Sequence, residues 1–226
     1  VKRATRLGVG SPPMAHPKMG VLFCHAAGFC AEVWRPVIDE LSALARQPRG
    51  AAELVMSAID LPGHGQAGSE APPLPLTPEP FCDAVLRAAC GASGGSNALG
   101  ASGGSGTSLV GVGHSLGGTA LVLAELARPG TFGTLVLYEP ILYPPWVPPG
   151  RDPFTRITGK NPLAAGAERR RTSFGSADEA RAQLLSKPLF AAMEPRAFDG
   201  YLRGGLRAAT AAGSGGGAGG GGAGGG

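Results

Sequence analysis

The stretch Gly113-His114-Ser115-Leu116-Gly117 decides the fold, because it places the pattern G-x-S-x-G between a predicted strand and a predicted helix. Residues 108–112 form an apolar run that predicts a buried strand, and 116–128 are apolar on nearly all sides, which is typical of a buried helix. A sharp strand-to-helix turn crowds the neighbours of its central residue, so it needs glycine two positions to either side. Such a turn projects the Ser115 hydroxyl above the sheet edge, beside a helix N-terminus that favours negative charge. The stretch therefore predicts a serine nucleophile.

Outward from this turn, the same alternation of strands and helices continues. The apolar runs 21–24, 53–60 and 134–138 predict three more buried strands. Apolar residues at helical spacing over 32–46, and again over 81–90, predict helices between them. Strands that alternate with helices favour a parallel sheet covered on both faces.

Beyond residue 140 the pattern changes. Residues 143–163 are rich in proline and cannot continue a helix. Ser176 and Glu179 have the spacing of a capping box ahead of a helix that reaches about Ser186. Pro195 can open one more helix. No fifth strand is predicted before a glycine-rich tail.

Composition indicates one folded domain with two low-complexity tracts. Of the 39 glycines, 7 lie in 91–107 and 11 lie in 213–226. A net charge of +4, without aromatic residues interleaved among the basic ones, gives little support to nucleic-acid binding. No apolar run approaches the roughly 18 residues of a membrane-spanning helix. The four cysteines show neither a CxxC pair nor zinc-ligand spacing, so we expect reduced thiols in a soluble intracellular protein of unspecified compartment.

Three motifs follow one another over residues 20–140. His25-Ala26-Ala27-Gly28-Phe29 follows the first predicted strand, residues 60–65 (DLPGHG) begin at the end of the second, and the G-x-S-x-G stretch around Ser115 follows the third. In this order they resemble the oxyanion loop, the D-x-x-G-H-G loop and the nucleophile elbow of the α/β-hydrolase superfamily. The resemblance implies an α/β fold, namely a three-layer sandwich with a mostly parallel sheet and a helical cap, with the last strands missing. The expected organisation is an irregular segment (1–19), a core (20–140) with an insertion (91–107), a cap (141–212) and a disordered tail (213–226).

The resemblance also implies roles for single residues. Ser115 would be the nucleophile, and the backbone N–H groups of Ala27 and Leu116 would form the oxyanion hole. Glu139, at the end of the fourth predicted strand, is a candidate acid. Residues expected to contact the substrate are Phe29, His114 and Trp146. The implied partner is a small-molecule ester or related acyl substrate, and no cofactor or metal is implied.

The base that such a mechanism needs is not found where the family places it. The family's order is serine, acid and then histidine, whereas all four histidines of this chain, His16, His25, His64 and His114, precede Ser115. We therefore expect a C-terminally incomplete serine hydrolase with little turnover as given. Several alternatives stay open. His25 or His64 could replace the missing base, or the protein could be non-catalytic and bind a small apolar ligand. Carbon–carbon bond hydrolysis and acyl transfer are alternative reactions.

Overall fold

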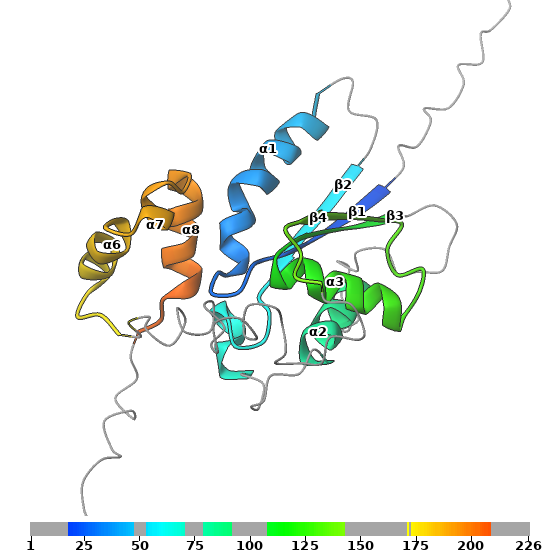
Figure 1. The fold of residues 1–226 in the computed structure, drawn as a ribbon. Coiled ribbons are helices and arrows are strands. Elements are labelled where there is room, and N and C mark those ends of the chain that lie inside the picture. Colours follow the sequence, from blue (N-terminus) through cyan, green and yellow to red (C-terminus); the bar gives the residue numbers. More distant parts are fainter. Residues whose placement is uncertain are drawn as a thin grey trace, which may run out of the picture.

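Four parallel strands form the centre of the computed structural model, which describes residues 18–47, 53–70, 79–91, 108–142, 171 and 173–208. The strands lie in the order β2-β1-β3-β4 (Figure 1). Their bounds are Lys18–Cys24 for β1, Glu53–Ile59 for β2, Ser108–His114 for β3 and Thr134–Tyr138 for β4. All three pairings between neighbouring strands are parallel, which confirms the predicted α/β class. Among the described residues the sheet is short, as expected.

The strand bounds differ in detail from the predicted ones. β1 begins at Lys18 rather than at residue 21, because Lys18 and Met19 pair with the first residues of β2. β2 ends at Ile59 rather than at residue 60, because Ile59 pairs with Cys24, the last residue of β1. β3 extends to His114, where it pairs with Tyr138 of β4.

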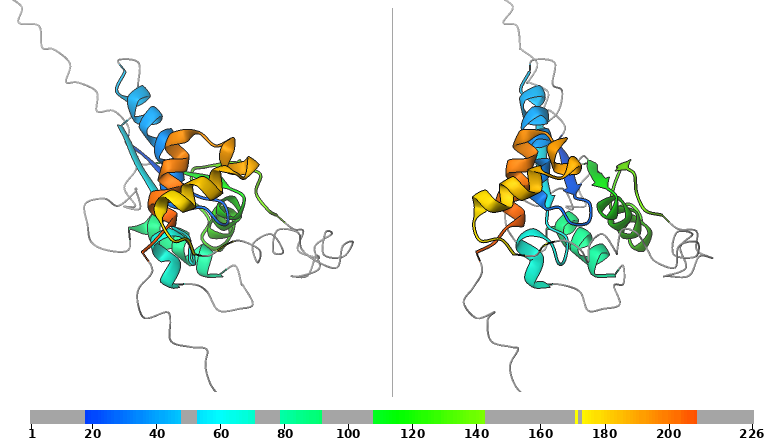
Figure 2. Two further views of the ribbon diagram at one scale, coloured as in Figure 1. Left: turned by 90° about the vertical axis from the view of Figure 1, so that its left-hand side faces the viewer. Right: turned by 60° about the vertical axis from the view of Figure 1, so that its left-hand side comes forward.

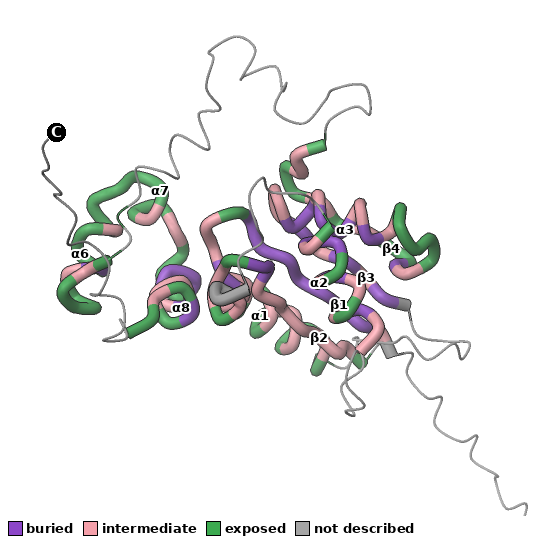
Figure 3. The backbone as a smooth tube through the Cα atoms, turned by 90° about the horizontal axis from the view of Figure 1, so that it is seen from below, coloured by how far each residue is buried: buried purple, intermediate pink, exposed green. Residues whose placement is uncertain are grey.

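Helices cover both faces of the sheet (Figure 1). A 3-10 turn, η1 (Ala31–Trp34), leads into α1 (Arg35–Ala45) on one face, and α2 (Glu79–Cys90) and α3 (Leu116–Ala127) pack on the other. The main core lies between the sheet and α2 and α3, and Figure 3 shows the buried backbone running along β1 and β3. Its fully buried side chains include Leu22, Leu61, Val85 and Leu121.

The strands β1 and β3 are neighbours in the sheet but do not follow one another in the chain, and this arrangement positions the site. The chain passes from β1 outward to β2 and then returns to the other side of β1 to form β3. The connections after β1 and β3 therefore leave toward opposite faces and open a crevice at the carboxyl ends of these two strands. Ligands of open parallel sheets bind in such a crevice.

Three short helices lie within the segment expected to form the cap, and the last of them, α8, lies beside α1 (Figure 2). They are α6 (Ala177–Leu185), α7 (Pro188–Ala191) and α8 (Pro195–Gly205). The Ser176 hydroxyl accepts from the Glu179 N–H at 3.0 Å, which confirms the predicted capping residue, and Pro195 opens α8 as predicted. The tracts 91–107 and 213–226 lie almost wholly outside the described residues, so the domain limits stay predictions. None of the described helices has the length and apolar content needed to cross a bilayer.

Candidate active site

Ser115 occupies a strained turn between β3 and α3. Its backbone angles are φ 51° and ψ −116°, in a region that non-glycine residues rarely adopt. Its N–H donates to the Tyr138 carbonyl at 3.0 Å, and its own carbonyl accepts from the Thr119 N–H at 3.0 Å. Strain of this kind costs about 1–3 kcal/mol and persists only where the surrounding structure fixes the residue. The backbone thus has the form that the G-x-S-x-G pattern predicts.

The two outer glycines of the pattern are required by close backbone contacts. A Cβ atom on Gly113 would lie 2.6 Å from the Gly118 nitrogen, inside the first turn of α3. A Cβ atom on Gly117 would collide with the carbonyl oxygen of Cys24, and would lie 2.7 Å from that of His25. The second contact also shows that the elbow packs directly against the loop that leaves β1.

That loop, residues 25–30, contains the predicted oxyanion residue Ala27. The Phe29 N–H donates to the Ala26 carbonyl at 3.1 Å and closes a tight turn, and Gly28 takes a positive φ of 79°. Ala27 is exposed at the tip of this turn. Since Cys24 pairs with Gly113 in the sheet, Ala27 in the loop after β1 and Leu116 at the start of α3 both follow strands that meet at the crevice.

His25 is fully buried, and both of its ring nitrogens form hydrogen bonds. Nδ1–H donates to the Ala26 carbonyl at 2.8 Å, and Nε2 accepts from the Leu61 N–H at 3.0 Å. Burial lowers the pKa of His25 from 6.5 to about 4, so the ring is neutral at pH 7. In this conformation His25 connects the loops after β1 and β2, and neither nitrogen is left to act as a base.

Asp60 connects the same two loops through its carboxylate. One oxygen accepts from the Ala31 N–H at 2.7 Å, and the other accepts from the Gln66 N–H at 2.8 Å. A Cβ atom on Gly65 would collide with this carboxylate. The D-x-x-G-H-G stretch is therefore a structural clamp. Its histidine, His64, has Nδ1 3.0 Å from the Pro62 carbonyl.

Glu139, the candidate acid, directly follows β4 with a positive φ of 45°. The hydrogen bond from the Ser115 N–H to the Tyr138 carbonyl places the peptide before Glu139 beside the elbow. The Thr119 hydroxyl donates to the Ile141 carbonyl at 2.8 Å and fixes the chain that leaves β4. Ser115 and Glu139, the two non-glycine residues with positive φ in the described part of the chain, thus follow neighbouring strands at one edge of the sheet. The Glu139 side chain itself is exposed.

The structure gives a different result for each of the three residues expected to contact the substrate. The Phe29 ring lies against two rings of the expected cap segment. Its centroid is 6.4 Å from that of the Phe190 ring and 5.7 Å from that of the Tyr201 ring. Because side chains alternate along a strand and Gly113 faces α3, His114 points to the opposite face, where its ring meets Tyr138 edge-on at 5.1 Å. Trp146 lies outside the described residues. The structure therefore brings Phe29, but not His114, to the cap.

Sequence reasoning missed the way in which α8 docks on the core. A Cβ atom on Gly200 would collide with the Glu32 carbonyl, and one on Gly204 would lie 2.8 Å from the Sγ of buried Cys30. Two glycines four residues apart on one helix face allow this close packing against η1. The spacing was visible in the sequence, but nothing local to it identifies the surface that it contacts.

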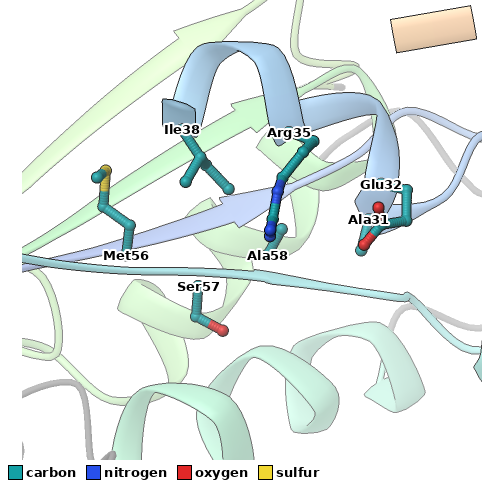
Figure 4. A pocket seen from close by; sticks show the side chains of 7 residues that line it. All are labelled: Ala31, Glu32, Arg35, Ile38, Met56, Ser57 and Ala58. Atoms are coloured by element: carbon teal, nitrogen blue, oxygen red, sulfur yellow. The ribbon is translucent and has the colours of Figure 1, made fainter. Parts of the chain in front are cut away.

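A cavity of about 220 Å³ lies between α1 and β2, away from the elbow (Figure 4). It is lined by Ala31, Glu32, Arg35, Ile38, Met56, Ser57 and Ala58. The cavity is smaller than the roughly 300–1,000 Å³ that is usual for ligand sites, and β1 separates β2 from β3. We therefore do not place the active site there. The described residues contain no group of three or more His, Cys, Asp or Glu arranged to hold a metal ion.

Comparison with known proteins supports the fold described above. Residues 21–220 match the alpha/beta hydrolase family. A peroxisomal alpha-beta-hydrolase from Saccharomyces cerevisiae has a TM-score of 0.62 at 18% identity, over 83% of this chain and 50% of that one. E-2-(acetamidomethylene)succinate hydrolase has a TM-score of 0.55 at 18% identity, over 83% of this chain and 56% of that one. The thioesterase domain from the curacin biosynthetic pathway has a TM-score of 0.52 at 19% identity, over 86% of this chain and 60% of that one.

The chain thus spans 50–60% of the length of these structures, and the likeness at this level of identity is one of fold. No protein of curated function matches the sequence. The family match, in contrast, covers well over half of the chain. It spans the loop after β1, the elbow and the described cap helices. On these grounds the protein belongs to the alpha/beta hydrolase family.

Proposed function

We propose that this protein is a serine hydrolase that cleaves an ester or a related acyl substrate. Membership of the family supports a hydrolase-type function. The observation that carries the finer proposal is the strained Ser115, held at the crevice between β1 and β3. Two of the structural neighbours are named as a hydrolase and a thioesterase, but this chain shares only the fold with them. The proposal of an acyl substrate therefore depends on the elbow around Ser115.

The proposed reaction proceeds in two steps. The Ser115 Oγ attacks the carbonyl carbon of the substrate while a base accepts the hydroxyl proton. The carbonyl oxygen becomes an oxyanion, to which the N–H groups of Ala27 and Leu116 donate hydrogen bonds. The bond to the leaving alcohol breaks and the base returns its proton to that alcohol. Water then attacks the acyl-enzyme, which releases the carboxylic acid and regenerates Ser115.

Two of the described histidines, His25 and His114, are poor candidates for the base of this mechanism. Both His25 nitrogens form hydrogen bonds, and His114 points to the sheet face opposite α3. We therefore propose that a histidine outside residues 1–226 completes the triad, with Glu139 as the acid that orients it. The position of Glu139 beside the elbow supports this role.

A covalent probe of serine nucleophiles tests the proposal. A fluorophosphonate should label Ser115 in the native protein, and Ser115→Ala should lose both the label and ester hydrolysis. Ser173→Ala, which changes an exposed serine before α6, is the matched control and should retain both. The 226-residue chain alone should react far more slowly than the native protein. Absence of labelling and of hydrolysis in the native protein would refute the proposal.

A second candidate is a non-catalytic protein that binds a small apolar ligand. The observation in its favour is that, among the described residues, no histidine forms a hydrogen bond with the Ser115 hydroxyl. The intact mass of the native protein discriminates between the two. A mass close to 22.6 kDa, combined with no ester turnover, would favour the binding function.

A further inference from the structure

We propose that Phe29 is a positioning residue, through which the cap sets the location of the Ala27 N–H. This inference rests on the proposed function, in which that N–H stabilises the oxyanion. The geometry behind it is the aromatic contact between the loop after β1 and the helices α7 and α8.

The start of the loop is fixed by the core, whereas its end contacts both the core and α8, where the Cys30 thiol donates to the Gly200 carbonyl at 3.8 Å. His25 anchors its start by hydrogen bonds to the Ala26 carbonyl and the Leu61 N–H. Asp60 anchors its end by accepting from the Ala31 N–H. Between these anchors, the described contacts of Ala27 to Phe29 are the turn hydrogen bond to the Ala26 carbonyl and the packing of the Phe29 ring. The orientation of the exposed Ala27 peptide therefore depends on what holds Phe29.

The Phe29 ring is held by two aromatic residues of the cap. Tyr201 of α8 meets it edge-on, with a centroid distance of 5.7 Å and an interplanar angle of 68°. Phe190 of α7 lies at 6.4 Å, and Phe190 and Tyr201 also contact each other at 4.9 Å. Phe190 further contacts the buried ring of Phe198 at 6.0 Å. These four rings form one aromatic cluster, which transmits the position of α7 and α8 to the loop.

The helix α8 is itself fixed to the core, so the cluster has a rigid support. Its glycines Gly200 and Gly204 pack directly on η1, as described above. Arg203 pairs with Glu32 at 3.6 Å, and Arg196 pairs with Glu40 of α1 at 3.1 Å. The ion pairs are exposed and contribute little, so the close glycine packing is the main anchor. A shift of α7 against α8 would change the packing around Phe29 first.

The kinetic signature of a positioning residue differs from that of a residue that merely lines the substrate site. Hydrogen bonds to the oxyanion strengthen as charge develops, so a displaced Ala27 N–H lowers kcat and leaves KM nearly unchanged. Loss of a simple substrate contact would instead raise KM at constant kcat.

The test uses Phe29→Leu and Phe190→Leu, which remove a ring from the loop side and from the cap side while they keep an apolar side chain. Phe29→Tyr keeps the ring and serves as the rescue variant. Phe174→Leu is the control, because that ring contacts Arg171 rather than the aromatic cluster. Two readouts are measured: kcat and KM of the native protein on a simple acyl ester, and amide hydrogen exchange of residues 25–30 by mass spectrometry.

In both leucine variants we expect kcat to fall about tenfold with KM within about twofold of wild type. Exchange at residues 25–30 should become about tenfold faster in both leucine variants, whereas Phe29→Tyr should restore slow exchange and Phe174→Leu should behave like wild type. A raised KM at unchanged kcat, or unchanged exchange in both leucine variants, would overturn the inference. If the native wild-type protein hydrolyses no ester, the proposed function fails. The exchange measurement then tests by itself whether the cap holds residues 25–30 in place. Faster exchange in the leucine variants supports this, and unchanged exchange overturns it.

Discussion

Acid should destabilise this protein through one buried side chain, His25. The neutral ring accepts from the Leu61 N–H through Nε2, so protonation would break that bond and place a charge in the core. Burial lowers the pKa of His25 from 6.5 to about 4 in the folded protein. Since the unfolded chain binds the proton more tightly, stability is fully present above pH 6.5 and is lost as the pH falls toward 4.

The size of this effect follows from the two pKa values. The two pKa values of His25 differ by about 2.5, which lowers the free energy of unfolding by about 3 kcal/mol below pH 4. About 2 kcal/mol of this loss occurs between pH 7 and pH 4.5. Backbone hydrogen bonds hold the pKa values of Glu125 and Glu179 below the ordinary range, so their stabilising contribution is lost at lower pH than that of His25.

The assay is urea unfolding at pH 7.0, 5.5 and 4.5, compared between wild type and His25→Gln. The glutamine variant is less stable at pH 7 because it loses one of the two hydrogen bonds, but its stability should change little over this interval. His114→Gln, which changes a ring that contacts Tyr138 rather than His25, is the matched control and should keep the dependence of the wild type. A wild-type free energy of unfolding that is constant from pH 7 to 4.5, or an equal slope in His25→Gln, would refute the reasoning.

Three further predictions concern the elbow and its support. Gly117→Ala forces a methyl group against the Cys24 carbonyl, so it should reduce stability by about 1–3 kcal/mol in thermal unfolding, whereas Gly205→Ala, which meets only ordinary contacts, should not. Asp60→Ala leaves two backbone N–H groups without their acceptor and should lower the urea midpoint by the equivalent of about 2–4 kcal/mol. In the same assay Asp199→Ala, which removes an exposed ion pair, should cost less than about 1 kcal/mol. Glu139→Gly should raise Tm, because glycine adopts the positive φ at this position without strain. The gain in the free energy of unfolding should be about 1 kcal/mol. A lower Tm would show that the carboxylate supports the fold.

The elements that the sequence predicted well are those whose signals are local. The helix starts at Ser176 and Pro195 depend on capping within one turn, and both lie where they were predicted. The elbow around Ser115 could also be predicted, since both glycines and the flanking apolar runs lie within a few residues. Strand ends were less accurate, because pairing with a distant strand decides where β1 begins.

The roles of the loop residues could not be read from the sequence. His25, His64 and Asp60 all belong to motif-like stretches, and any of them has the chemistry of a catalytic group. Their hydrogen bonds assign His25 and Asp60 to the support of the loops after β1 and β2. The two hydrogen bonds that join these loops, between His25 and Leu61 and between Asp60 and Ala31, span 36 and 29 residues of chain, for which sequence spacing gives no signal.

By itself, then, the sequence determined the parallel α/β class, the strained serine and its place between a strand and a helix, because backbone sterics and hydrophobic periodicity act over short distances. Only the tertiary structure decided which loops meet at the crevice between β1 and β3, and that Phe29 faces Phe190 and Tyr201 across 160 residues or more of chain. Contacts of this kind arise from the order of strands in the sheet and from the close packing of Gly200 and Gly204 on η1. Both are properties of the assembled fold, which no single stretch of sequence contains.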